Sequence, residues 1–247
     1  MSIPVNISEL LKSFSLYSNE LESKPPQEVL SWSLETFSPK IAFASSFGAE
    51  DVVIIDMLYK ICGKDAKVFT LDTGRLNPET YDVMDQIKKR YQISIITMFP
   101  DYGEVEKMVN EKGVNLMYND VSDRKLCCEI RKVHPLRRML KDLDAWITGL
   151  RREQTFTRSN IKKVDLDASN NNIVKISPLV DWTNGMVWDY IKKNDLPYNK
   201  LHDRGYPSIG CAPCTRAIAA GEDLRAGRWW WENDSHKECG LHWSKSS

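Results

Sequence analysis

The sequence has no apolar run long enough to cross a membrane, and it carries no excess of charge of either sign. A membrane-spanning helix needs about 18 or more consecutive apolar residues, and no such run occurs in the chain. The 34 basic residues balance the 34 acidic ones, which argues against a nucleic-acid partner bound through a general positive field. The N-terminus is polar and Ser-rich, unlike a secretory signal peptide. Any site for an anionic ligand must therefore be built locally.

Cysteines are few, and the expected compartment bears on their role. The sequence contains six cysteines. Nothing in it predicts export, so we expect a cytoplasmic protein whose thiols stay reduced. Cysteines in a reducing compartment bind metals or catalyse reactions more often than they form disulfides. Internal repeats are also lacking, so we expect a single α/β domain with a chemically active set of cysteines.

Short apolar runs alternate with segments of helical periodicity from residue 41 onward. This alternation predicts an α/β fold with a doubly wound, mostly parallel sheet. Gly63, Asn77 and Thr183 occupy positions typical of helix caps. We expect strands at 41–44, 67–71, 93–99 and 145–148, a hairpin at 161–176, and helices at 27–37, 49–61, 78–90 and 183–193.

Three loops at the expected carboxyl ends of strands are chemically distinctive, at 45–48, 72–75 and 149–152. Ligands of doubly wound sheets bind where such loops converge. The first loop contains Ser45, Ser46 and Gly48 directly before a helix. Its amide groups can hold a phosphate at the helix N-terminus. Turns of this kind are common in α/β proteins, so this one alone is weak evidence for an anion site.

Four of the cysteines form two close pairs. Cys127 adjoins Cys128, and Cys211 is joined to Cys214 by two intervening residues. Two such pairs can supply four thiolates to a metal centre. Adjacent side chains diverge, which would strain their binding to one zinc ion, whereas a 4Fe-4S cluster offers each thiolate a separate iron. The residues favour the cluster, and zinc binding and simple core packing stay open as alternatives.

The two remaining cysteines have different surroundings. Cys62 lies within an apolar helix, so we expect it to pack in the core. Cys239 lies between Lys237 and His242 in a polar segment, where cations can favour its thiolate. A thiolate is a competent nucleophile at neutral pH. The local sequence supports a catalytic role for Cys239 and an inert tail cysteine equally well.

The cysteine pattern and five further motifs resemble one known family. From about Ile41 onward the chain is similar to the assimilatory adenylyl sulfate (APS) reductases, relatives of the 3′-phosphoadenylyl sulfate (PAPS) reductases. The resemblance implies an adenine nucleotide alpha-hydrolase-like fold. It rests on both cysteine pairs and on Lys-Glu-Cys-Gly-Leu-His at 237–242. The five motifs are Ser-Ser-Phe-Gly-Ala-Glu at 45–50, Leu-Asp-Thr-Gly-Arg at 71–75, Thr-Gly-Leu-Arg-Arg-Glu-Gln at 148–154 with Arg-Ser at 158–159, Gly-Cys-Ala-Pro-Cys-Thr at 210–215, and Arg-Ala-Gly-Arg-Trp-Trp-Trp-Glu at 225–232.

The resemblance implies thiol-dependent reduction of APS to sulfite and AMP in sulfate assimilation. Cys239 would attack the sulfur of APS, displace AMP and become an S-sulfocysteine (a thiosulfonate). A thioredoxin or glutaredoxin, arriving as a separate protein, would then release sulfite. The sulfonate is anionic, so cations must offset its repulsion of the thiolate. By resemblance these are Lys132, Arg225 and Arg228, and His242 is either a further member or a solvated tail residue.

The resemblance also implies a set of ligands for the nucleotide and for the cluster. Asp72 is not among them, and we expect it to be a loop residue rather than an acid–base catalyst. The nucleotide ligands would be Ser45, Ser46, Gly48, Leu71, Thr73, Gly149 and Arg158, and the cluster ligands Cys127, Cys128, Cys211 and Cys214.

Three segments make up the chain in this interpretation. Residues 1–38 form an N-terminal helical segment, and residues 39–221 form the nucleotide-binding α/β domain with the iron–sulfur cluster. Residues 222–247 form a flexible C-terminal tail that carries Cys239 to the sulfate and then to a redoxin. We interpret the tryptophans at 229–231 as anchors that dock this tail rather than as a stacking platform for a base.

Two other functions and one other substrate fit parts of the sequence. An adenylating enzyme of the ATP pyrophosphatase type needs a loop resembling Ser-Gly-Gly-x-Asp-Ser, but Phe47 stands where its second glycine would be. The other is a four-cysteine zinc module that binds nucleic acid or protein, against which the balanced charge and the lack of a basic stripe argue. PAPS is an alternative substrate, alone or beside APS, although by resemblance the cluster cysteines go with APS. The oligomeric state is open, and a homo-oligomer is compatible with the sequence.

Overall fold

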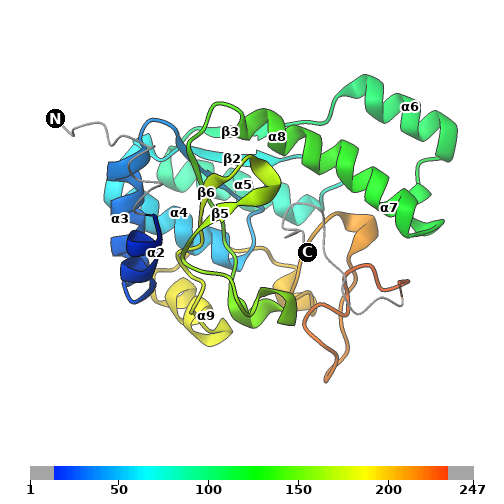
Figure 1. Ribbon diagram of the computed structural model, residues 1–247. Coiled ribbons are helices and arrows are strands. Elements are labelled where there is room, and N and C mark those ends of the chain that lie inside the picture. The colour runs from blue at the N-terminus through cyan, green and yellow to red at the C-terminus, as the bar shows by residue number, and fades with distance from the viewer. Residues whose placement is uncertain (1–13, 233–247) are drawn as a thin grey trace.

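The computed structural model describes residues 14–232, which form a six-stranded sheet covered by helices (Figure 1). The strands are β1 (Ile41–Ala44), β2 (Val68–Leu71), β3 (Ile95–Met98), β4 (Ala145–Ile147), β5 (Val164–Asp167) and β6 (Ile173–Ile176). The helices are α2 (Phe14–Glu22), α3 (Pro26–Phe37), α4 (Ala49–Cys62), α5 (Pro78–Tyr91), α6 (Tyr102–Lys112), α7 (Val121–Cys128), α8 (His134–Leu140) and α9 (Asn184–Lys193). Within residues 14–232, no helix is both long enough and apolar enough to span a bilayer.

The sheet has the strand order β3-β2-β1-β4-β6-β5. Every neighbouring pair is parallel except β5 and β6, which are antiparallel. The mostly parallel sheet and the hairpin predicted at 161–176 are therefore confirmed. The direction of chain progression reverses between β1 and β4. In doubly wound sheets such a reversal opens a crevice at the carboxyl ends of the strands, where ligands bind.

Alternating side chains of each strand divide the core between the two faces of the sheet. Ile41 and Phe43 of β1 pack into the main core, to which α3, α4, α5 and α9 contribute. Ala42, between them, packs on the other face with Leu136 and Leu140 of α8. Because successive side chains of a strand point to opposite faces, helices cover both faces, as expected for a doubly wound fold.

Helices α2, α6, α7 and α8 lie where apolar periodicity does not predict a helix. Helix α2 is polar, but the Ser18 hydroxyl donates a hydrogen bond to the Val164 carbonyl (2.7 Å) and Leu21 packs in the main core. Helix α7 continues through a π-helical turn, Glu129–Val133, directly into α8. Tertiary contacts of this kind stabilise helices whose own sequence preference is weak.

The three predicted caps behave differently. Gly63 ends α4 in a positive-φ conformation (φ 59°), and the Thr183 hydroxyl caps α9 by accepting a hydrogen bond from the Met186 amide (3.2 Å). Asn77 occupies the predicted N-cap position of α5 but makes no capping bond. Its Nδ2 instead donates to the carbonyl of Gly210 (3.1 Å), a partly buried loop carbonyl. This bond ties α5 to the segment that carries Cys211.

The first part of the expected C-terminal tail packs against the domain. Trp229 is 1% exposed, and Thr215 forms an isolated antiparallel bridge with Arg228. In Figure 1 this segment, at the red end of the colour scale, lies beside α7. The remainder of the predicted tail, residues 233–247, lies outside the described residues, and with it Cys239 and His242.

Candidate active site

A cavity of about 270 Å³ lies at the carboxyl edge of the sheet, at the switch point between β1 and β4. The loops after β1, β2 and β4 line it, together with the segments near 207–211 and 224–229. The structure brings together here every predicted nucleotide ligand and every described residue of the predicted sulfate end. These are Ser45, Ser46, Gly48, Leu71, Thr73, Gly149, Arg158, Lys132, Arg225 and Arg228.

The loop after β1 is organised by a buried carboxyl group. The amide and the hydroxyl of Ser46 both donate to Oδ2 of Asp51, over 2.6 and 2.8 Å. The Phe47 amide donates to the Ser45 hydroxyl (3.1 Å), and Phe47 has a φ of 58°. The loop then leads into the N-terminus of α4, where amide groups favour an anion. Two donors of Ser46 are thus engaged in shaping the turn.

Asp51 is fully enclosed, and this changes its ionisation. Burial raises the pKa of Asp51 from 3.8 to about 7, with a further increase from the charge of Glu50, although the hydrogen bonds from Ser46 oppose it. A Cβ atom on Gly149 would lie only 2.2 Å from Oδ1 of Asp51. Glycine is therefore required at 149, because the loop after β4 approaches this carboxyl group too closely for any side chain.

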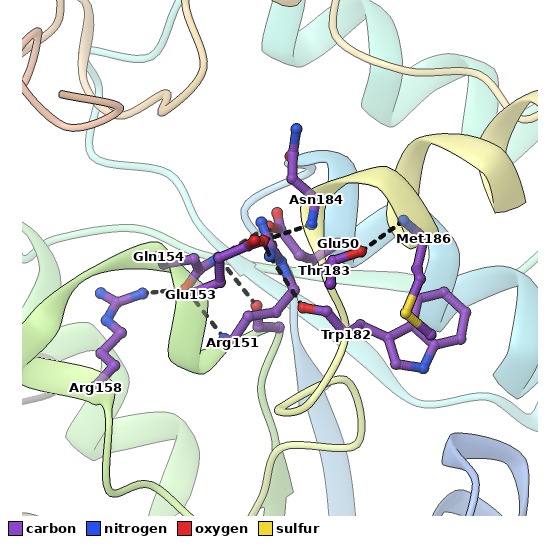
Figure 2. Close-up of polar contacts among 10 residues, drawn as sticks. Glu50, Arg151, Glu153, Gln154, Arg158, Trp182, Thr183, Asn184 and Met186 are labelled. Atoms are coloured by element: carbon purple, nitrogen blue, oxygen red, sulfur yellow. Dashed lines mark hydrogen bonds and ion pairs between the residues drawn. The ribbon is translucent and has the colours of Figure 1, made fainter. Parts of the chain in front are cut away.

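Arg151 joins the loop after β4 to α4. Its side chain is buried, and Nε donates to Oε1 of Glu50 (2.8 Å). The side-chain Nε2 of Gln154 donates to the same carboxylate oxygen (2.9 Å), and Oε1 of Gln154 accepts a hydrogen bond from Nη1 of Arg158. Figure 2 shows the side chain of Arg158 pointing toward Gln154, which lies beside Arg151 and Glu50. The network holds Arg158 at the wall of the cavity.

The same arginine connects this loop to α9. Nη1 of Arg151 donates to Oε2 of Glu153 (2.8 Å) and to the carbonyl of Trp182 (3.1 Å). Glu153 also accepts a hydrogen bond from the amide of Asn184 (2.6 Å), at the start of α9 (Figure 2). Asn184 itself lines the cavity. One buried guanidinium thus fixes the relative positions of the elements around this side of the cavity.

The loop after β2 faces both the cavity and the cysteines. The Thr73 hydroxyl lies 3.3 Å from Sγ of Cys211, and the Thr73 carbonyl accepts a hydrogen bond from Nη1 of Arg131 (2.7 Å). Asp72 accepts hydrogen bonds from the amide of Gly74 (2.8 Å) and the hydroxyl of Tyr81 (3.0 Å). Asp72 thus lies in the loop, as predicted, and these bonds hold the loop in place.

The three predicted sulfate-end cations come from two separate parts of the chain. Lys132 lies in the π-helical turn between α7 and α8, and Arg225 and Arg228 lie in the C-terminal segment. Arg228 is buried, and its Nη1 lies 3.3 Å from both the Ser208 hydroxyl and the Ile209 carbonyl. A Cβ atom on Gly210 would approach Nη2 of Arg228 to 2.3 Å, so glycine at 210 leaves room for this guanidinium.

Four cysteines line a second, smaller cavity. Cys127 and Cys128 end α7, and Cys211 and Cys214 flank a tight turn. All four are buried, free thiols. The same cavity is bordered by the cations Arg75, Arg124, Arg131 and Lys132. Among residues 14–232, no three His, Cys, Asp or Glu side chains are arranged to hold a single metal ion.

The surroundings of the cysteines shift their pKa values in different directions. Burial raises the pKa of Cys127, and it raises the pKa of Cys214 to about 12, with a further increase from Cys211. Burial acts in the same direction on Cys211, but the charge of Lys132, the Thr73 hydroxyl and the charge of Arg228 outweigh it and lower its pKa. Of Cys127, Cys211 and Cys214, only Cys211 has surroundings that favour the thiolate.

The two cavities have a common wall. Lys132, Cys211 and Trp229 line both of them. Trp229 has the Arg124 guanidinium over its ring at 4.7 Å and that of Arg228 at 4.8 Å. The predicted sulfate-end cations and the cysteines thus lie around two adjoining cavities.

Several residues of this site are not apparent from the sequence. Asp51, Glu50 and Arg151 act through contacts between segments about a hundred positions apart, and no local pattern marks those contacts. His202 also lines the cavity, where burial lowers its pKa and its Nδ1 lies 2.8 Å from the Tyr206 carbonyl. The only signal for Glu50 and Arg151 is that they fall within the loop motifs.

Known proteins resemble this chain along most of its length. Residues 40–217 match the phosphoadenosine phosphosulfate reductase domain. A protein of Burkholderia cepacia named adenosine 5′-phosphosulfate reductase is 49% identical over 203 residues, which cover 82% of this chain and 80% of that protein. A protein of the same name from Pseudomonas aeruginosa (strain LESB58) is 44% identical over 247 residues, covering 98% of this chain and 88% of its own.

A solved structure extends the similarity to three dimensions. The crystal structure of phosphoadenylyl-sulfate (PAPS) reductase from Candida auris, a phosphate complex, has a TM-score of 0.69 and 30% identity to this chain. The similarity covers 86% of this chain and 98% of the Candida auris chain. The domain match spans well over half of the sequence. The chain therefore belongs to the phosphoadenosine phosphosulfate reductase family.

Proposed function

We propose that this protein is an assimilatory APS reductase, an oxidoreductase that converts adenylyl sulfate into sulfite and AMP. The observation that carries the proposal is the common wall between a cation-lined cavity at the switch point and four buried thiols. Relatives named adenosine 5′-phosphosulfate reductase are 44% and 49% identical to this chain, which favours APS as the substrate. The domain match favours a reductase over an adenylating enzyme or a zinc module.

The nucleotide end of the cavity would lie at the loops that follow β1, β2 and β4. The turn at Ser45, Ser46 and Gly48 supports binding of the single phosphate of AMP at the start of α4. The adenosine would contact Leu71, Thr73 and Gly149, and Arg158 would add a cation. Since Arg158 is held by Gln154, its guanidinium is positioned before the nucleotide arrives.

The sulfate end would lie at Lys132, Arg225 and Arg228. These cations offset the repulsion between an incoming thiolate and the anionic sulfonate, and they stabilise the charge that develops on the departing phosphate oxygen. They are supplied partly by the same short segment that leads toward Cys239. His242 is proposed for the same end of the substrate. His242 and Cys239 lie outside the described residues, so their roles rest on the family resemblance.

The reaction proceeds in two thiol steps. The Cys239 thiolate forms a bond to the sulfur of APS as the bond from that sulfur to the AMP phosphate oxygen breaks, and AMP leaves with the electron pair. The product is an S-sulfocysteine. One thiol of a thioredoxin or glutaredoxin then attacks Sγ of Cys239 and expels sulfite, and its second thiol resolves the mixed disulfide. The redoxin dithiol supplies both electrons and ends as a disulfide.

The cysteine cavity suits a 4Fe-4S cluster. Cys127, Cys128, Cys211 and Cys214 would be the four ligands, and the surrounding cations would balance the negative charge of cluster and thiolates. When bound, the cluster would cross-link α7 to the turn at 212–214 and contribute to the field beside the sulfate. A cytoplasmic setting belongs to the same proposal, because these thiols and a redoxin donor both require reducing conditions.

The decisive assay uses anaerobic holoenzyme with APS or PAPS as substrate. Thioredoxin is added, and sulfite is measured for each nucleotide. Sulfite from APS, with little from PAPS, is the expected result. Comparable rates would make the protein a dual reductase, and sulfite from PAPS alone would overturn the APS assignment. Release of pyrophosphate from ATP, without any sulfite, would contradict the proposed reaction altogether.

Replacing the proposed nucleophile tests the covalent step. Cys239→Ser should abolish sulfite formation, because a serine hydroxyl is not ionised at neutral pH and cannot form the thiosulfonate. The variant should keep the brown colour and the iron content of the parent protein. Turnover that persists in Cys239→Ser would exclude this residue as the nucleophile.

A further inference from the structure

We infer that the ion pair between Arg124 and Glu232 is a positioning device for the Cys239 thiol. The pair fixes the base of the C-terminal segment onto the helix that carries Cys127 and Cys128. The inference rests on the proposed function, in which Cys239 is the nucleophile. It assigns a role to two residues that do not line the nucleotide cavity and take no direct part in the reaction.

The geometry of the pair is that of a rigid fork. Nε and Nη2 of Arg124 donate to Oε1 and Oε2 of Glu232, over 2.8 and 3.0 Å. The two side chains are only 4% and 3% exposed. Two parallel charge-assisted bonds fix orientation as well as distance. Removing either partner of such a buried pair strongly destabilises a fold, because the other charge is left buried without compensation.

Arg124 links this pair to the cysteines and to the sulfate end. It lies on α7 and interacts electrostatically with Cys128. Its guanidinium also lies over the ring of Trp229, which carries the Arg228 guanidinium over it as well. The position of the segment at 228–232 is thereby set by α7.

A second anchor attaches the same segment to the other cysteine pair. The ring of Trp231 packs edge-on against Tyr118, with centroids 4.5 Å apart. The Tyr118 hydroxyl donates to the carbonyl of Pro213 (2.6 Å), within the turn between Cys211 and Cys214. The segment is therefore held by both elements that bear cysteines, and Glu232 is its last described residue.

The length of the remaining chain gives the expected size of the effect. Cys239 follows Glu232 by seven positions, so its reach from a fixed Glu232 is at most about 25 Å. If Arg228, which forms the bridge with Thr215, were instead the last fixed residue, eleven positions would separate it from Cys239. The reach of the thiol would then grow to about 40 Å. The effective concentration of the thiol at the sulfate falls roughly as the −3/2 power of tether length, so it would then fall about twofold.

The test compares Glu232→Gln with a matched control, Glu222→Gln. Glu222 forms a similar two-bond pair with Arg216 in the same part of the chain, but that pair is partly exposed. Anaerobic holoenzyme of each variant is mixed with APS without a redoxin, and the S-sulfonation of Cys239 is followed by intact mass. Glu232→Gln should slow this step about twofold, whereas Glu222→Gln should match the wild type. Iron content and AMP affinity should be unchanged in both variants.

The outcomes separate the inference from the proposed function. If wild-type Cys239 gains no sulfonate, the proposed function fails. If it does, and Glu232→Gln reacts at the same rate, the positioning role is refuted while the function stands. Loss of iron or AMP affinity in proportion to the rate would also refute it, since the pair would then support the site only structurally. Should Glu232→Gln not fold, Arg124→Lys keeps the charge without the fork and should slow the same step.

Discussion

At the residue scale, the shape of the cavity at the switch point depends on the buried carboxyl group of Asp51. It accepts both hydrogen bonds of Ser46 and lies against Gly149 without room for a side chain. Its burial has a thermodynamic consequence. The folded protein holds a proton on this group at pH values where the unfolded chain has released it, so the stability of the fold changes with pH.

Asp51→Asn should make thermal stability less sensitive to pH. Because the pKa of Asp51 rises from 3.8 to about 7 on folding, its contribution to the free energy of unfolding is lost as pH rises through this window. The loss is roughly 4 kcal/mol at most. Asparagine does not titrate, so the melting temperature of the variant should fall less than that of the wild type between pH 4 and pH 7. Parallel melting curves for the two proteins across this range would contradict the raised pKa.

Residues at the ends of predicted strands could be placed in the site from the sequence alone. Ser45, Thr73 and Gly149 follow short apolar runs, and the sheet brings those strand ends together. The contacts that require these particular residues could not be predicted in the same way. Gly149 is needed because of Asp51, which is 98 positions away (149 − 51), and no local pattern encodes such a contact.

At the scale of elements, strands and amphipathic helices were predictable where their periodicity is strong. All four predicted parallel strands occur, with ends that differ by a residue or two from those expected. The helices α6, α7 and α8 were not predicted, because their exposed faces are highly charged and their buried faces are narrow. The buried part of α7 consists of Asp123, Arg124, Cys127 and Cys128, which do not form the apolar stripe that periodicity detects.

Helix α9 offers a test of one cap. Thr183→Ala removes the hydroxyl that accepts the Met186 amide, and losing such a cap costs about 1 kcal/mol. For a chain of this size the melting temperature should fall by about 2–4 °C. Thr155→Ala is the control, since its hydroxyl lies 3.3 Å from that of Thr157 at the surface. Equal melting temperatures for the Thr183 and Thr155 variants would show that the cap is not stabilising.

At the scale of the whole molecule, the cysteines join parts of the chain that are far apart in sequence. Cys127 and Cys128 belong to α7, whereas Cys211 and Cys214 belong to the segment that follows the last helix. The sequence predicted this pairing through spacing and family resemblance. It also predicted that the tryptophans at 229–231 anchor the C-terminal segment, but it did not predict that Trp229 and Trp231 contact Arg124 and Tyr118 or that Glu232 pairs with Arg124.

Removing one ligand should therefore affect colour and stability together. Cys211→Ser should lose iron, acid-labile sulfide and the visible absorbance, and its melting temperature should fall because α7 and the turn at 212–214 lose their cross-link. Cys62→Ser is the matched control, as this partly buried thiol lies in α4, 3.2 Å from the Leu58 carbonyl and outside the cysteine cavity. A Cys211→Ser protein with full iron content would show that this cysteine is not a ligand.

The wall formed by Lys132, Cys211 and Trp229 also constrains how this protein can evolve. Each of the three residues faces the nucleotide cavity on one side and the cysteines on the other. A substitution selected for a new nucleotide would alter the cysteine site at the same time, and loss of the cysteines would reshape the nucleotide cavity. At these three positions we therefore expect a change in substrate preference and a change in the cysteine site to be coupled.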